Sequence, residues 1–280
     1  MDKVDRKEKS NTNKTVSPNH KEFLQAGGRN DAHLLIPSGD CLLKATFASR
    51  EHSFYKRLHN YNEWVSSKIT PEFYGFENHD LGHGMQEYIR MKNVTFNYKR
   101  PFVLDLKVGI HSWHPEIPSY KLQKRLKTDE TSTTNLLGVR FCGCKRVVGD
   151  QTLSYNRHLS LNEITTRDAL KRYIKLFLFD GVKYRVAALP YFVSRLDKII
   201  ELMRMDKFRI FGASTLFVYD ADAKDEEKKF DLRFIDFAHT WCLDKEECKM
   251  EDGVIFGMEN LKCMLNEISV EITGKKIKTM

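Results

Sequence analysis

The sequence predicts an α+β protein of two lobes, a small β-rich lobe followed by a larger lobe of mixed helices and strands. Strand-like apolar runs dominate residues 34–108, whereas apolar residues at helical spacing recur between residues 160 and 203. With 280 residues, 41% of them hydrophobic, the chain can bury a substantial core. A polar stretch near residue 100 separates two strand-like runs, so we expect an N-lobe at residues 22–100 and a C-lobe at residues 101–280.

The first 21 residues differ in composition from the rest. They hold six Lys or Arg against three Asp or Glu and almost no large apolar side chain. Such a segment cannot offset the entropy of ordering, so residues 1–21 are expected to form a disordered basic tail. The sequence contains neither a signal peptide nor an apolar run of roughly 20 residues. We therefore expect a cytoplasmic or nuclear protein, a monomer without a membrane span.

The N-lobe begins with a predicted β-hairpin. Runs at 34–36 and 41–45 flank a Pro-Ser-Gly-Asp turn. Phe54, Leu58, Tyr61 and Val65 then recur at helical spacing, which predicts one amphipathic helix ending near Pro71. Two further strands are predicted, at residues 85–94 and 102–108.

The C-lobe is predicted to be rich in helices. Ser160 and Glu163 form a capping-box pattern in front of an apolar helical face, and a second helix is expected to begin at Pro190. Strands at 216–219 and 232–237, joined by a charged loop, complete the prediction together with a closing helix around residues 261–268.

Asp105 and Lys107 lie on the same face of a predicted strand. A spacing of two residues places their Cα atoms about 6.5 Å apart. The pair could be an ordinary solvent-facing strand edge, or it could form the floor of a phosphate-transfer site, and this pattern alone leaves both interpretations open.

Asp236 stands at the end of an apolar strand. A carboxylate there is costly unless it is paired or holds a metal ion, and Mg²⁺ favours one or two carboxylates together with nucleotide phosphates. A buried Asp that caps a helix or pairs with Arg is the alternative. Lys44 ends the second hairpin strand, where many phosphate-transferring enzymes keep a Lys for the nucleotide phosphates.

A basic run at residues 121–127 leaves Lys121, Lys124 and Arg125 on the polar side of a predicted helix. It is either a solvated surface or a binding face for a polyphosphate, and the formal net charge of +8 fits an acidic partner. Neither a Walker phosphate loop nor the motif set of protein kinases is present.

Three ordered motifs carry a family resemblance. Pro101, Asp105, Lys107 and Gly109 match P-x-x-x-D-x-K-x-G, residues 214–220 are similar to S-S-L-L-x-x-Y-D/E, and residues 235–239 read I-D-F-A-H. Over about residues 23–270 the chain resembles the inositol polyphosphate kinase family, which implies a two-lobed kinase-like fold. Residues 104–107, 133–143 and 255–261 look like its hexakisphosphate kinase branch, as does Lys92-Asn93-Val94, although Lys92 replaces an acid.

The resemblance implies roles for individual residues. The Lys92 carbonyl and Val94 amide would hold adenine, Asp105 the ribose hydroxyls and Lys44 the ATP phosphates. Asp236 would bind Mg²⁺ with support from Ser214. Lys107 would lie between the γ-phosphate and the acceptor, so that Lys107, Asp236 and Lys44 form the catalytic group. Other residues would bind the substrate phosphates. A helical inositol-phosphate-binding segment at about residues 112–160 would provide Lys121, Lys124, Arg125 and Arg157, and His239 would reach the substrate from beside the magnesium site.

The implied function is an ATP- and Mg²⁺-dependent kinase that converts inositol hexakisphosphate to a diphosphoinositol pentakisphosphate. One alternative is a multikinase or trisphosphate kinase that phosphorylates a free inositol hydroxyl. Another is a non-catalytic module that binds inositol phosphates or RNA. Intact Asp105, Lys107 and Asp236 argue against a module without activity, and because no RNP-like aromatic motif is present we expect no nucleic-acid partner.

Overall fold

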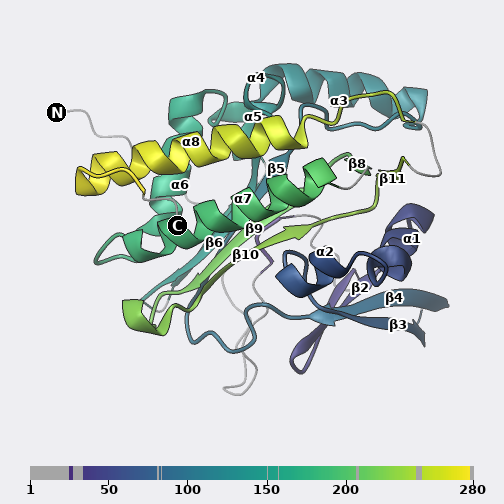
Figure 1. Cartoon of the computed structure of the whole chain (residues 1–280), viewed down its shortest axis with the longest axis horizontal. Coiled ribbons are helices and arrows are strands. Elements are labelled where there is room, and N and C mark those ends of the chain that lie inside the picture. The colour runs from purple at the N-terminus through teal and green to yellow at the C-terminus, as the bar shows by residue number, and fades with distance from the viewer. Residues whose placement is uncertain are drawn as a thin grey trace.

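The computed structural model describes residues 25–27, 34–80, 82, 84–149, 151–156, 158–205, 208–243 and 248–277. These residues form a four-stranded sheet with two short helices at one end and a five-stranded sheet covered by long helices at the other (Figure 1). The predicted basic tail at residues 1–21 lies outside the described residues. None of the helices in the described part combines the length and the apolar character that crossing a bilayer would require.

The first sheet is antiparallel, with strand order β1-β2-β4-β3. Its strands are β1 (Leu35–Ser38), β2 (Cys41–Ala45), β3 (Phe73–Asp80) and β4 (Met85–Lys92). The predicted hairpin is confirmed, because Ser38 pairs with Cys41 across a turn at Gly39. Strand β3 was not predicted, since its apolar residues are interrupted by a glycine and polar side chains.

The single helix predicted from Phe54 to Val65 is wrong. The chain forms two helices, α1 (Ser49–Leu58) and α2 (Asn62–Ser67), because Tyr61 N–H bonds back to the Leu58 carbonyl and leaves helical geometry. Because the second helix begins at Asn62, a different side chain from the predicted one faces the core. Trp64 is fully buried, whereas Val65 is 51% exposed.

The second sheet is antiparallel, with strand order β10-β9-β5-β6-β7. Its strands are β5 (Pro101–Val108), β6 (Val139–Val148), β7 (Gln151–Asn156), β9 (Ser214–Asp220) and β10 (Phe230–Ile235). A separate two-stranded antiparallel sheet consists of β8 (Phe208–Ile210) and β11 (Thr240–Cys242). The chain passes from the first sheet to the second between Lys92 and Pro101.

The expectation that residues 112–160 are helical holds only in part. Helices α3 (Ser119–Thr131) and α4 (Thr134–Leu137) precede β6 and β7, and α5 (Leu159–Asn162) follows them. Strand β6 was missed because its Gly, Cys and basic residues hide the alternation. The structure pairs it along its length with the central strand β5.

Three long helices cover the second sheet (Figure 1). They are α6 (Arg167–Leu178), α7 (Leu189–Met205) and α8 (Val254–Thr273), and two short 3₁₀ turns lie at Val186–Ala188 and Asp225–Glu227. The capping prediction was wrong: Thr166, rather than the Ser160–Glu163 pair, caps α6, and its hydroxyl accepts a hydrogen bond from Ala169 N–H at 3.2 Å. The predicted helix at Pro190 and the closing helix correspond to α7 and α8.

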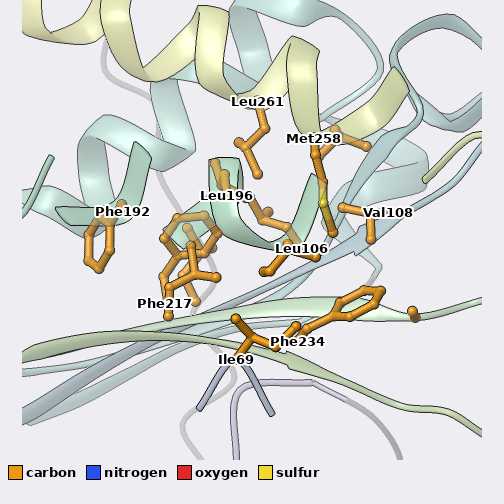
Figure 2. Close-up of a cluster of buried hydrophobic side chains, with 14 of the residues drawn as sticks. Ile69, Leu106, Val108, Phe192, Leu196, Phe217, Phe234, Met258 and Leu261 are labelled. Atoms are coloured by element: carbon orange, nitrogen blue, oxygen red, sulfur yellow. The ribbon is translucent and has the colours of Figure 1, made fainter. Parts of the chain in front are cut away.

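The main core lies between the sheet and the helices. Figure 2 shows Leu196 of α7 and Met258 and Leu261 of α8 above Leu106 and Phe217 of the sheet. All five side chains are at most 1% exposed, so large-to-small substitutions here would leave cavities.

Two glycines allow α8 to approach the turn between α4 and β6. A Cβ atom at Gly257 would overlap the carbonyl of Gly138, which itself accepts a hydrogen bond from Gly109 N–H at 2.9 Å. Asn260 of the same helix donates to the Leu137 carbonyl at 3.0 Å. The backbone of the turn is therefore packed directly against the helix backbone.

We expect Gly257→Ala to destabilise the protein by about 1–3 kcal/mol, because overpacking at this contact outweighs the gain in helix propensity of about 1 kcal/mol. Urea unfolding followed by circular dichroism measures this. Val270→Ala, an exposed position in the same helix, is the control and should stay within about 0.5 kcal/mol. A more stable Gly257→Ala protein would contradict the close packing.

Candidate functional site

One carboxylate and two ammonium groups from three distant segments meet between the two sheets. Lys44 of β2 reaches Asp236 Oδ1 at 3.0 Å, and Lys107 of β5 reaches Asp236 Oδ2 at 2.5 Å. Lys107 Nζ also donates to the Gly212 carbonyl at 2.8 Å. The structure thus brings together the three residues that the sequence singled out separately.

The backbone conformation of Asp236 aims its carboxylate at the lysines. Asp236 follows β10 with φ +68°, in the left-handed region that few residues other than Gly, Asn and Asp adopt. Burial would raise the pKa of Asp236, but attraction and hydrogen bonds from Lys107 and Lys44 outweigh burial and hold this pKa far below its ordinary range. The carboxylate is therefore ionised at every physiological pH.

Glu51 is a further member of this cluster that the sequence analysis missed. It is 3% exposed, accepts from Lys44 Nζ at 2.7 Å and accepts from Phe237 N–H at 3.3 Å. Burial works to lower the pKa of Lys44, but Asp236 and Glu51 outweigh it and raise this pKa above its ordinary value. The sequence did contain a signal for Glu51. It lies on the apolar face of α1 with Phe54 and Leu58, where an acidic side chain without a partner would cost free energy.

Asp105 and Ser214 contribute two buried side chains that lie close to each other. Among the described residues, Asp105 Oδ1 and Ser214 Oγ make no hydrogen bond of ordinary geometry, although Ser214 and Cys142 lie near enough to work against the rise in the pKa of Asp105. Burial raises the pKa of Asp105, and the nearby Lys107 opposes this rise. Because Asp105 is 5% exposed and Lys107 bonds to Asp236 instead, the interpretation as a solvent-facing Lys–Asp pair is wrong.

The sheet register places Ser214 beside the charged cluster. Ser214 pairs with Lys107 of β5 on one side and with Ile235, the residue before Asp236, on the other. Its hydroxyl oxygen thus lies beside Lys107 and Asp105 in a buried polar environment, where an oxygen ligand for a hard cation would fit.

The predicted adenine-binding residues lie where β4 ends. The Lys92 side chain pairs with Asp40 at 2.8 Å and so points along the hairpin rather than toward the cluster. Val94 packs with Val103 and Val218 on the face of the second sheet that bears no long helices. Val94, Val103 and Val218 form a small apolar wall beside the connection between the sheets.

The predicted substrate residues are only partly connected with the cluster. The His239 ring stacks on His114 with ring centroids 3.9 Å apart. Burial, His114 and Arg125 lower the pKa of His239 to about 4, and burial also lowers the pKa of His114, where Arg125 and Lys121 add to the effect. Lys121 and Arg125 of α3 therefore lie close enough to act on these rings.

Two residues of the predicted substrate set stand apart. Lys124 is exposed on the same helix, one turn from Lys121. Arg157 lies outside the described residues. His114 was not predicted, and no spacing in the sequence marks it, since its contact with His239 arises from the fold.

The comparisons with known proteins identify the family of the chain. The family model described as inositol polyphosphate kinase matches residues 88–266, which include Asp105, Lys107, Ser214 and Asp236. Inositol hexakisphosphate kinase 3 from Mus musculus is 29% identical over 206 residues, 65% of this chain and 50% of that protein. Inositol hexakisphosphate kinase 2 from Homo sapiens is 24% identical over 253 residues, 77% of this chain and 59% of that protein. The chain thus spans about half to three fifths of the length of these relatives.

Solved structures share the fold. The inositol phosphate multikinase Ipk2 from S. cerevisiae, in complex with ADP and Mn²⁺, gives a TM-score of 0.68 at 21% identity and covers 82% of this chain and 99% of that one. A second inositol phosphate multikinase structure gives 0.61 at 19% identity, with 78% and 99% covered. At such identities the similarity shows the fold alone, and it confirms the predicted two-lobed α+β architecture.

The family model matches more than half of the chain, and the residues that carry its motifs build the charged cluster. The chain belongs to the inositol polyphosphate kinase family.

Proposed function

We propose that the chain is an ATP- and Mg²⁺-dependent inositol polyphosphate kinase that converts inositol hexakisphosphate to a diphosphoinositol pentakisphosphate. The observation that carries the proposal is the convergence of Lys44 and Lys107 on Asp236. Phosphoryl transfer depends mainly on positioning and on neutralising charge. Two lysines fixed by a shared carboxylate supply both.

We assign the nucleotide to the connection between the sheets. The backbone of Lys92 and Val94 would hold adenine, and the apolar wall formed by Val94, Val103 and Val218 supports this. Asp105 would accept hydrogen bonds from the ribose. A buried carboxylate oxygen without a partner costs free energy, and hydroxyl donors would recover it.

Asp236 and Ser214 would hold the magnesium ion together with the nucleotide phosphates. The Ser214 hydroxyl is fully buried beside Asp105 and makes no hydrogen bond of ordinary geometry with a described residue, which fits an oxygen ligand for a hard cation. When bound, the ion would neutralise charge on the phosphoryl group during transfer. Lys44 would bind the nucleotide phosphates from the other side of the carboxylate.

Lys107 would lie between the γ-phosphate and the acceptor, where its charge stabilises the transferring group. With a pKa of about 4, His239 is neutral near pH 7 and would serve as a hydrogen-bond partner rather than a cation. The positive charge for the acceptor phosphates would therefore come from Lys121, Lys124, Arg125 and Arg157.

The ionisation state of Asp236 supports a phosphate group, rather than a hydroxyl group, as the acceptor. An acceptor phosphate oxygen is already largely deprotonated and needs no general base, whereas an inositol hydroxyl must lose a proton. Asp236, bonded to two lysines and with a strongly lowered pKa, is poorly suited to take that proton. The hexakisphosphate kinases among the relatives support the same acceptor, while the multikinase structures keep the hydroxyl alternative as an outcome to test.

The purified chain with Mg²⁺ and labelled ATP should transfer phosphate to inositol hexakisphosphate, giving a labelled diphosphoinositol product. Inositol trisphosphate, offered separately, is the comparison. Labelling of the trisphosphate alone would assign the chain to the multikinase alternative. Labelling of neither would leave a binding module.

Asp236→Asn should lower kcat by roughly a thousandfold or more, because the metal ligand and the anchor of both lysines lose their charge. Circular dichroism should still show a folded protein. Asp222→Asn, which removes an exposed carboxylate paired with Arg100, is the matched control and should leave kcat unchanged. Undiminished turnover in Asp236→Asn would refute the proposed metal role.

Glu51→Gln should raise KM for ATP about five- to tenfold, because Lys44 loses one of its two carboxylate partners and is oriented less firmly. Steady-state kinetics at varied ATP concentration measures this effect. Glu63→Gln, an exposed acid on α2, serves as the control. Equal KM values for the two variants would show that Glu51 does not position Lys44.

A further inference from the structure

A cavity of about 250 Å³ opens beside α1, on a different helical face from the one that carries Glu51. Helix α1, the residue Glu116 and the two-stranded sheet of β8 and β11 surround it. Its lining residues are polar at the helix and apolar at the base: Ser49, Arg50, Ser53, Phe54, Arg57, Tyr61, Glu116, Phe208, Thr240 and Cys242. None of the lysines of the charged cluster lines it.

Arg57 is the cationic side chain in this cavity that pairs with none of the described carboxylates. It is half-buried, and no described residue forms an ion pair or a side-chain hydrogen bond with it. A guanidinium group presents five donors and cannot lose its charge in a protein. A half-buried one without an acceptor is therefore a ready site for an anion.

Ser49 and Ser53 add hydroxyl donors on the same side of the helix. They precede Arg57 by two turns and one turn, so the three side chains follow one line along α1. Neither hydroxyl is engaged with another described residue. The line therefore offers one guanidinium and two hydroxyl groups to a single ligand.

Arg50 supplies a second guanidinium at the rim, where its position is fixed. It bonds to Glu116 at 2.6 Å and stacks on Trp241 with its guanidinium carbon 4.1 Å from the ring centre. Counting Arg50, Arg57 and Glu116, the lining carries a net charge of +1. The cavity thus favours an anion.

The volume is sufficient for a compact anion. With about 250 Å³ of accessible space, the cavity has room for a phosphate group.

We propose that this cavity is a second anion site, which binds a compact phosphate-bearing anion through Arg57, Ser53 and Ser49. Its phosphate group could be free orthophosphate or part of a small phosphate ester. Asp236, Lys44 and Lys107 do not line the cavity, although Arg50 and Glu116 at its rim also act on His114, which stacks on the predicted substrate residue His239. Anion binding in the cavity does not depend on the kinase activity.

An anion here would act on the position of α1. Phe54, at the base of the cavity, stacks on Phe237 with centroids 4.0 Å apart. Thr240 of β11, another lining residue, donates its hydroxyl to the Phe237 carbonyl at 2.9 Å. A ligand bound by these three α1 side chains would fill the space between α1 and β11 and so bear on the Phe54–Phe237 contact.

Equilibrium dialysis of the full chain against labelled orthophosphate, at constant ionic strength and without nucleotide, tests the proposal. Arg57→Gln should weaken binding at this site at least tenfold, because a charge-assisted hydrogen bond is lost. Lys56→Gln removes the same charge from the next, exposed residue of α1 and should stay within about twofold of the unchanged chain. Any binding at the kinase centre is the same in both variants, so their difference reports on the cavity.

Competition with glycerol 2-phosphate distinguishes the two sources of the phosphate group. If glycerol 2-phosphate displaces the Arg57-dependent labelled orthophosphate at a lower concentration than unlabelled orthophosphate does, the ligand is an ester. If it requires a higher concentration, the ligand is free phosphate. Equal orthophosphate binding by Arg57→Gln and Lys56→Gln would overturn the proposal. The proposal would also be overturned if the unchanged chain bound no orthophosphate at concentrations up to about 10 mM. That limit corresponds to a free energy of dissociation below roughly 3 kcal/mol.

Discussion

The carboxylate of Asp236 joins the two sheets of the molecule by binding one lysine from each. Lys44 comes from the outer hairpin of the first sheet, and Lys107 from the central strand of the second. Their sequence separations from Asp236 are 192 and 129 residues, so the site exists only when both sheets have formed and docked. The relative position of the lobes and the geometry of the charged cluster are thus set by the same contacts.

Charge balance makes this partly buried cluster tolerable. The ammonium groups of Lys44 and Lys107 are matched by the carboxyl groups of Asp236 and Glu51. Removing charged groups from water costs several kcal/mol each, and attraction within a well-bonded cluster offsets that cost. Phosphates that enter here must share the lysines with the carboxylates, so a divalent cation arriving with them preserves the balance.

The sequence was most informative where chemistry and local pattern coincide. Asp105 and Lys107 lie within an apolar strand whose period is visible, and Asp236 directly follows another. Their motifs predicted the family, and the resemblance implied that Lys44, Lys107 and Asp236 act together. Contacts that arise only from the fold were beyond the sequence. The His114–His239 stack is one, and the break between α1 and α2 is another, because nothing in the local spacing distinguished Trp64 from Val65 as the buried residue.

Glu51 both stabilises the local fold and positions a lysine of the proposed site. Its carboxylate accepts from Lys44 and from the backbone of Phe237, directly after the left-handed residue Asp236. A non-glycine residue in that conformation costs about 1 kcal/mol or more and persists only when its surroundings fix it. Here the surroundings are Glu51 on one side of the turn and the Phe54–Phe237 stack on the other. Helix α1 therefore determines both where Lys44 points and how the Asp236 turn is held, and any force that moves this helix acts on both at once.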